Sequence, residues 1–264
     1  MLIIGEKINS SIPSVGPAIA NKDKAFIQKL AVDQAEAGAD FIDVNAGAFV
    51  QEEAELLPWL VEIVQEAVDR PLCIDSPNPA ALANALAVSR KKAIVNSISL
   101  EKDRYESIIP LIQKSGSSII ALCMDGRGIP ATAEQRFEIA RTLVERLTGD
   151  GIAAEDIYID AMAQPIGTDS NSGRVTLNTV AAVRQGLPGV HITCGLSNVS
   201  FGLPKRRLLN QSFAVSLAVS GMDAFFIDPL DERLMSLLRS TEAILGEDKY
   251  CRKFIKASRV GKLV

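Results

Sequence analysis

The sequence predicts an α/β fold, a (β/α)8 TIM barrel. Short apolar segments alternate with longer amphipathic segments along the 264 residues, and eight such pairs can be counted. Strands that alternate with helices favour a parallel sheet with right-handed crossovers. A barrel of this kind commonly uses about 250 residues as one domain. We therefore expect a single domain over residues 1–264, in which residues 246–264 form an irregular or short helical closing segment.

Each expected strand is followed by its own helix. The strands are expected at residues 2–8, 41–44, 71–75, 93–98, 118–124, 157–161, 191–196 and 224–227. The helices are expected at residues 23–37, 54–68, 79–88, 102–114, 133–147, 174–185, 207–220 and 232–245, and the first of them stops at Gly38. A doubly wound open sheet is the alternative. It would have a glycine-rich first turn, whereas this first turn reads GEKINSS.

Composition narrows the classes of function. The chain is 47% apolar and 23% charged, with a net charge of −4, which argues against nucleic acid as the main ligand. No apolar run reaches the ~18–20 residues that span a bilayer, and MLIIGEKIN lacks the features of a signal peptide. The four cysteines lie far apart and form no CxxC pair, so we expect reduced thiols. We expect a cytoplasmic protein with no membrane segment.

Carboxylates and carboxamides follow the expected strands, and catalytic groups of this fold lie at those strand ends. A partly buried Asp can accept two parallel hydrogen bonds, and Asn can read a ring edge of mixed polarity. Such a set suits a neutral, flat heterocycle such as a pterin better than a phosphate. The alternative is that these residues are helix caps and turns, as Asp75-Ser76-Pro77-Asn78 suggests. Asn198 is not expected to be a helix N-cap, because it lies nine residues before its expected helix.

Six segments resemble one enzyme family. They are MLIIGEKIN, DVNAG (43–47), LCIDS (72–76), VNS (95–97), YIDA (158–161) and GLSNVSFGLPKRRLLNQSF (195–213). The sequence resembles the pterin-binding methyltransferases, in particular the methyltetrahydrofolate:corrinoid protein methyltransferases of anaerobic bacteria. Dihydropteroate synthase and the folate domain of cobalamin-dependent methionine synthase are relatives. The resemblance covers essentially the whole chain and implies a (β/α)8 barrel that moves a methyl group between a corrinoid (methylcobalamin) and N5 of tetrahydrofolate.

The same resemblance implies roles for residues of this chain. Asp75, Asn96 and Asp160 would hold the edge of the pterin ring, and Asn198 would lie against N5. Gly195 and Ser197 would line the same pocket, and Arg206 would face the folate tail or a docked corrinoid protein. Four further residues of the strand ends are candidates for the pocket: Glu6, Asp43, Asn45 and Met124. No metal ligand is expected within this chain.

The corrinoid is expected to arrive on a partner protein. A corrinoid-binding loop of the DxHxxG type needs a histidine, and the one histidine, His191, lies in PGVHITCG. We expect the corrinoid protein to dock at the barrel mouth, with residues 125–130 and 164–172 as candidate contact surfaces, and we expect a homodimer. Transfer from methylcorrinoid to tetrahydrofolate is the expected direction. The alternative is transfer from methyltetrahydrofolate to a corrinoid iron–sulfur protein in acetyl-CoA synthesis.

Four other functions are alternatives to methyl transfer. Dihydropteroate synthase must bind pyrophosphate, yet the basic residues 205–207 lie in a loop rather than at a strand end. A Schiff-base aldolase needs a desolvated lysine, for which Lys7 is the one candidate. A zinc-dependent thiol methyltransferase needs clustered Cys and His ligands, which the spacing does not provide. A silent folate-binding protein would bind tetrahydrofolate without transferring methyl.

Overall fold

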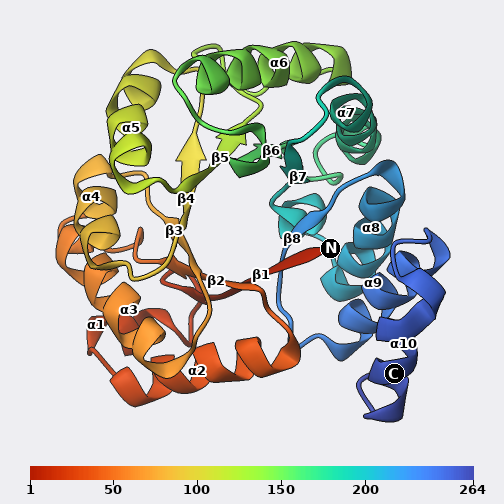
Figure 1. Ribbon diagram of the computed structural model, residues 1–264, viewed down its shortest axis with the longest axis horizontal. Coiled ribbons are helices and arrows are strands. Elements are labelled where there is room, and N and C mark those ends of the chain that lie inside the picture. The colour runs from red at the N-terminus through yellow and green to blue at the C-terminus, as the bar shows by residue number, and fades with distance from the viewer.

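The structure is a computed structural model that describes residues 1–264. Eight parallel strands form a ring that is surrounded by helices (Figure 1), with the order β7-β6-β5-β4-β3-β2-β1-β8. The predicted barrel is therefore confirmed. The strands are β1 (Leu2–Asn9), β2 (Phe41–Asn45), β3 (Leu72–Asp75), β4 (Ile94–Ile98), β5 (Ser118–Leu122), β6 (Ile157–Asp160), β7 (His191–Thr193) and β8 (Ala224–Ile227).

A helix follows every strand. The outer helices are α2 (Lys24–Ala37), α3 (Glu53–Ala67), α4 (Pro79–Val88), α5 (Lys102–Ser115), α6 (Ala133–Gly149), α7 (Ser172–Gly186), α8 (Arg206–Ser220) and α9 (Glu232–Ile244). The chain adds a short α1 (Gly16–Ala20) before α2, a 3-10 turn η1 (Ala154–Asp156) before β6, and η3 (Lys249–Cys251) with α10 (Arg252–Arg259) at the end. None of the helices has the length and apolar character that a membrane span requires.

Two strands end earlier than predicted. β5 stops at Leu122 rather than at residue 124, because the Met124 N–H turns back to bond the Leu122 carbonyl at 2.6 Å. β7 stops at Thr193 rather than at residue 196, and the chain then forms the 3-10 turn η2 (Leu196–Ser200). The apolar character of Leu196 fits burial against the barrel as well as it fits a strand, so hydrophobicity alone could not mark this end.

Side-chain alternation along the strands separates two apolar cores. One cluster of 57 buried residues fills the space between the strands and the helices. A second cluster of seven lies on the inward-facing positions and plugs the barrel: Ile4, Cys73, Ile94, Ile120, Tyr158, Ala224 and Phe226. Because successive strand residues face opposite sides, the residue two positions after each plug residue also faces inward, one layer nearer the mouth.

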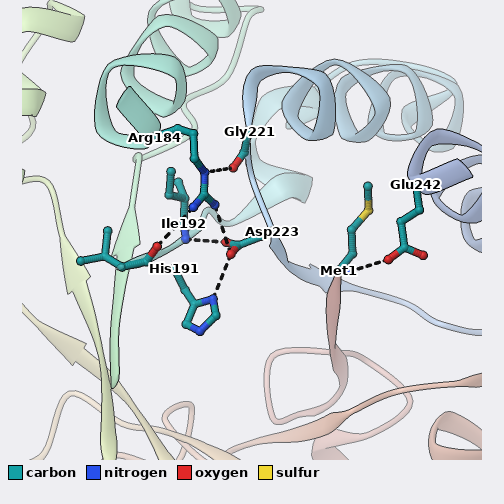
Figure 2. Close-up of polar contacts among 8 residues, drawn as sticks. Met1, Arg184, His191, Ile192, Gly221, Asp223 and Glu242 are labelled. Carbon is teal, nitrogen blue, oxygen red and sulfur yellow. Dashed lines mark hydrogen bonds and ion pairs between the residues drawn. The ribbon is translucent and has the colours of Figure 1, made fainter. Parts of the chain in front are cut away.

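The barrel closes without a strand ladder between β7 and β8. The Asp223 N–H bonds the Ile192 carbonyl at 3.3 Å, and the Asp223 carboxylate accepts the Ile192 N–H at 2.8 Å. The same carboxylate bonds His191 Nδ1 at 2.9 Å and pairs with Arg184 Nη2 at 3.1 Å (Figure 2). The single histidine thus has a structural role at the start of β7, at the end of the barrel opposite the mouth.

Candidate active site

Five of the predicted site residues share one layer of the barrel: Glu6, Asn45, Asp75, Asn96 and Asp160. Each follows by two positions an inward-facing residue of the layer below, as Glu6 follows Ile4 and Asp75 follows Cys73. The apolar inward-facing positions of these strands are therefore followed, one layer nearer the mouth, by polar residues. The members of this layer on the strands or directly after them are Glu6, Asn45, Asp75, Asn96, Asp160 and Asp228.

Asp75 and Asn45 form a hydrogen-bonded pair across β2 and β3. Asn45 Nδ2 donates to Asp75 Oδ2 at 2.8 Å, and the two residues are directly opposite in the ladder. Asn45 is itself held, because its Oδ1 accepts the Gly47 N–H at 2.9 Å and the Ser10 hydroxyl at 3.1 Å. Burial raises the pKa of Asp75 to about 6, although the bond from Asn45 opposes the rise. The second carboxylate oxygen of Asp75 is free to accept from a ligand.

Asp160 ends β6 on the other side of the mouth. Its carboxylate accepts the Met162 N–H at 2.6 Å, and Met162 takes the left-handed conformation, with φ 61°. Burial raises the pKa of Asp160 to about 6, and the bond from Met162 opposes the rise. Asn96, from β4, lies between Asp75 and Asp160 in the strand order, with a half-buried side chain. Two acceptor carboxylates therefore flank a carboxamide, an arrangement that suits adjacent N–H donors on a flat ring.

Asn198 lies on η2, directly after β7. Its side chain is exposed and folds back over Gly195, where a Cβ would come within 2.8 Å of Asn198 Nδ2. The absence of a side chain at Gly195 leaves room for the Asn198 carboxamide in this position. The neighbouring Ser197 hydroxyl donates to Glu6 Oε1 at 3.3 Å, which brings the end of β1 to the same loop.

The floor of the mouth holds two polar atoms without partners. Asp43, the β2 residue of the plug layer, is 2% exposed, and its Oδ1 has no hydrogen-bond partner. Thr193, opposite Asp160 in the ladder, is fully buried with its hydroxyl unpaired. Burial, reinforced by the charge of Asp75, raises the pKa of Asp43 well above its usual range, so the structure favours a neutral carboxyl group there.

Three arginines in the first turns of helices hold the loops of the site. Arg104 of α5 donates to the carbonyls of Ser97, Pro77 and Ser76 at 2.8, 2.6 and 2.9 Å. Arg136 of α6 and Arg206 of α8 make equivalent bonds to other loops. Arg136 is 1% exposed and bonds the carbonyls of Pro130, Ala161 and Met162, together with Gln164 Oε1, whereas Arg206 bonds the Ser197 carbonyl at 2.8 Å and the Ser200 hydroxyl.

This use of arginine was not predicted from the sequence. An arginine at the start of an amphipathic helix resembles an ordinary solvent-facing residue. The helix N-terminus also disfavours a cation, so sequence rules give no reason to expect a structural arginine there. Arg206 is expected in a loop, one residue before the predicted helix, but it is the first residue of α8. The contact of Arg206 with a folate tail or a partner stays a prediction.

The remaining candidates lie at the edge of the site. Met124 is half-buried just beyond β5. Lys7 pairs with Asp228 Oδ2 at 3.0 Å, and this ion pair occupies the amine that an aldolase-type imine would need. Burial raises the pKa of the Cys73 and Cys194 thiols well above the usual range, which disfavours thiolate chemistry. No group of three or more His, Cys, Asp or Glu side chains is arranged to hold a metal ion.

Comparison with known proteins identifies the family. The model of the pterin binding enzyme family matches residues 13–228. The chain belongs to the pterin binding enzymes. It is 41% identical to a methylcorrinoid:tetrahydrofolate methyltransferase of Eubacterium limosum, over 100% of this chain and 98% of that protein. The resemblance stated from the sequence motifs is confirmed.

More distant relatives of this pterin binding enzyme include methionine synthases and dihydropteroate synthases. It is 28% identical to a methionine synthase of Mycobacterium tuberculosis over 86% of this chain, which corresponds to 20% of that larger protein. Among solved structures, a Yersinia pestis dihydropteroate synthase matches with a TM-score of 0.74 at 17% identity, covering 93% of this chain and 94% of that one. A Xanthomonas albilineans dihydropteroate synthase matches with a TM-score of 0.68 at 18% identity, covering 94% and 93%. These structural likenesses support the barrel fold.

Proposed function

We infer that this enzyme transfers a methyl group from a protein-bound methylcorrinoid to N5 of tetrahydrofolate. The observation that carries this function is the layer formed by Asp75, Asn96 and Asp160, with the free carboxamide of Asn198 folded over Gly195 beside it. The full-length identity to a protein named methylcorrinoid:tetrahydrofolate methyltransferase supports the same conclusion. Dihydropteroate synthase is disfavoured because the inward layer offers no free cation for pyrophosphate: Lys7 is ion-paired.

Pterin binding follows from the acceptor layer. Asp75 and Asp160 accept the adjacent N–H groups of the ring edge, and Asn96 complements its mixed polarity. The walls around them are rigid, because Asn45 orients Asp75 and the Met162 N–H orients Asp160. Alignment of N5 with the incoming methyl group can lower the activation free energy by about 7–11 kcal/mol, and this is the main contribution of the protein to catalysis.

Asn198 acts at N5. A carboxamide can donate to neutral N5 or accept from protonated N5, so it stabilises charge as the carbon–nitrogen bond forms. Its freedom from other side-chain partners suits this exchange of roles. Methyl transfer in the reverse direction, from methyltetrahydrofolate, would use the same contacts with the opposite polarity.

The corrinoid protein docks on the rim of the mouth. Large apolar side chains are exposed in loops or first helical turns that follow the strands, on both sides of the opening. Such side chains are typical anchors of protein interfaces. The rim residues are Val50, Ile129, Phe201, Leu208 and Leu230, with exposed fractions from 38% to 77%. At the opposite end of the outer helices, Val219 and Ile244 are also exposed, which supports a homodimer through α8 and α9.

A methyl-transfer assay tests this function. Free methylcobalamin and tetrahydrofolate are mixed with the enzyme, and methylcobalamin loss and methyltetrahydrofolate formation are followed by absorbance and mass spectrometry. We expect stoichiometric conversion. Asn198→Ala is expected to lower the single-turnover rate about 100-fold, with the Kd for tetrahydrofolate changed less than about threefold. The matched control is Asn178→Ala, an exposed asparagine on α7.

The outcomes separate the alternatives. Binding of tetrahydrofolate without methyl transfer would identify a silent folate-binding protein and overturn the proposed function. Normal transfer by Asn198→Ala would remove Asn198 from the reaction while leaving the function intact. Methyltetrahydrofolate mixed with reduced corrinoid measures the reverse direction on the same enzyme.

A further inference from the structure

Five carboxyl groups occupy inward-facing positions on the strands or directly after them, and four of these have other partners or are sealed from the mouth. Asp75 accepts from Asn45, and Asp160 accepts the Met162 N–H. Asp228 is ion-paired with Lys7 at 3.0 Å, and Asp43 is sealed in the floor at 2% exposure. Glu6, the fifth, has one hydrogen-bond partner, the Ser197 hydroxyl, at the long distance of 3.3 Å.

Glu6 also lies where a proton could leave. It lines a cleft of about 300 Å³ together with Ser197, Asn210 and Asp228. Ser197 is the residue before Asn198, which we place at N5, so the cleft and the proposed N5 contact share one turn of the chain. Two further lining residues of the cleft, Arg207 and Leu230, also border a wider hollow at the surface of α8. A half-buried carboxylate at the inner end of such a path can exchange protons with solvent.

The proposed methyl transfer releases one proton. The N5 lone pair forms the bond to the methyl carbon, and the methyl–cobalt bond of the corrinoid substrate breaks with its electron pair left on cobalt. N5 of tetrahydrofolate carries a hydrogen, which must leave as a proton for neutral methyltetrahydrofolate to form. The balance is methyl–cobalt(III) plus H–N5, giving cobalt(I), methyl–N5 and H⁺.

We propose that Glu6 is the catalytic base that accepts this proton and passes it to solvent through the cleft. The inference rests on the proposed function, because it requires tetrahydrofolate N5 as the methyl acceptor. Ser197 and Asn198 then have separate tasks on one loop: Asn198 contacts N5, and Ser197 orients the Glu6 carboxylate.

The residues around Glu6 bring its pKa into the range that suits a proton acceptor at neutral pH. Burial raises its pKa to about 7, and the hydrogen bond from Ser197 opposes the rise. Charges face Glu6 from every element packed against it: Asp228, directly after β8, raises its pKa, and Lys7 of β1 and Arg206 of α8 lower it. Asp43 of β2 and the Arg207–Asp231 pair complete this environment. A base that titrates near neutral pH is matched to proton transfer at that pH.

Single-turnover transfer from free methylcobalamin to tetrahydrofolate, measured from pH 5.5 to 8.5, tests the inference. Wild-type rates are expected to rise with pH through a limb near pH 7, because the ionised carboxylate is the active form. Glu6→Gln is expected to slow transfer about 100-fold at pH 7.5 and to abolish the limb. Asp228→Asn is expected to shift the limb to lower pH, because it removes a negative charge that raises the Glu6 pKa.

Control variants and folding checks show whether a slow Glu6→Gln enzyme has lost the base or has lost its structure. Glu55→Gln, on the exposed face of α3, should match wild type at every pH. Circular dichroism and the Kd for tetrahydrofolate check folding of Glu6→Gln, and Glu6→Asp, which keeps the carboxylate, should retain the limb at a reduced rate. Glu6→Gln with a wild-type rate and limb would overturn the role of Glu6. Absence of transfer by the wild type itself would overturn the proposed function instead.

Discussion

The ionised form of Asp160, which the proposed pterin contact requires, lowers the stability of the folded protein. Its pKa is about 6 in the folded protein, against 3.8 as its ordinary value. The folded state therefore binds the proton more tightly than the unfolded state, and ionisation costs stability as pH rises from about 4 to about 6. At neutral pH the full cost is present, and a pterin that supplies N–H donors would relieve it.

Asp160→Asn is accordingly expected to stabilise the ligand-free protein by about 1–2 kcal/mol at pH 7.5. The gain should shrink as pH falls towards 4, because both states then bind the proton. Denaturant unfolding at several pH values measures it. Tetrahydrofolate affinity should fall about 10–100-fold in the same variant, since a charged acceptor is lost.

Asp33→Asn is the control, because Asp33 forms an exposed pair with Lys29 on α2. It should change stability by less than about 0.5 kcal/mol at any pH. A gain in Asp160→Asn that did not depend on pH would show that burial of charge is not its cause.

Residue type and strand position sufficed to predict that Asp75, Asn96 and Asp160 lie at strand ends around the mouth, because polar residues there interrupt an otherwise apolar period. Their contacts with a pterin stay predictions. The base role proposed for Glu6 could not be predicted, because it depends on Lys7 pairing with Asp228 rather than with Glu6. The unpaired Asp43 oxygen and Thr193 hydroxyl also required coordinates, since a sequence carries no account of which buried atoms lack partners.

At the scale of elements, the first-turn arginines connect helices to the loops of the mouth. Arg136 is the most buried of the three, and all of its bonds are made to oxygens that carry no formal charge. Its removal would leave several buried carbonyls without donors, and each such loss costs about 1–3 kcal/mol. The loop after β6, which follows Asp160, depends on it.

Arg136→Met should therefore destabilise the protein by about 3–5 kcal/mol, measured by urea unfolding. Arg136→Lys should rescue little, because one ammonium cannot replace the planar fork that reaches four oxygens. Arg141→Met is the control on the same helix, where the guanidinium pairs with Glu138 and Glu145 at the surface. Its cost should stay below about 1 kcal/mol. Equal costs for the two methionine variants would contradict the proposed support of the mouth loops.

Element boundaries were predictable wherever a strand ended at a clear change in polarity. β6 and β8 end within one residue of prediction, with Asp160 as the last residue of β6 and Asp228 directly after β8. β7 was predicted too long because its apolar residues continue into η2. The distinction between an apolar strand and an apolar turn rests on backbone hydrogen bonds, which the pattern of side chains does not reveal.

At the scale of the whole molecule, the proposed function assigns the apolar rim and the polar interior of the mouth to two different substrates. The interior suits a small polar ring, and the rim suits a protein. Leu208, which is 57% exposed in the first turn of α8, lies on this rim.

Leu208→Glu should raise the KM for a methylated corrinoid protein at least about tenfold, because it places a charge in a desolvated interface. The rate with free methylcobalamin should change less than about threefold, since that small substrate does not need the rim. Ser216→Glu, which places the same charge at an exposed site further along α8, should affect neither measurement. Equal loss with both methyl donors would show that Leu208 serves the mouth itself rather than a docked protein.

No strand ladder joins β7 to β8, so the strands next to this junction are held on one side only, unlike the rest of the barrel. Seven ladders link the strands from β8 through β1 to β7. The residues proposed to bind the pterin lie on β3, β4 and β6, each of which is laddered on both sides. Asn198, proposed to act at N5, follows β7, a three-residue strand that is laddered on one side only. A shift of β7 during turnover would then leave the proposed pterin contacts undisturbed.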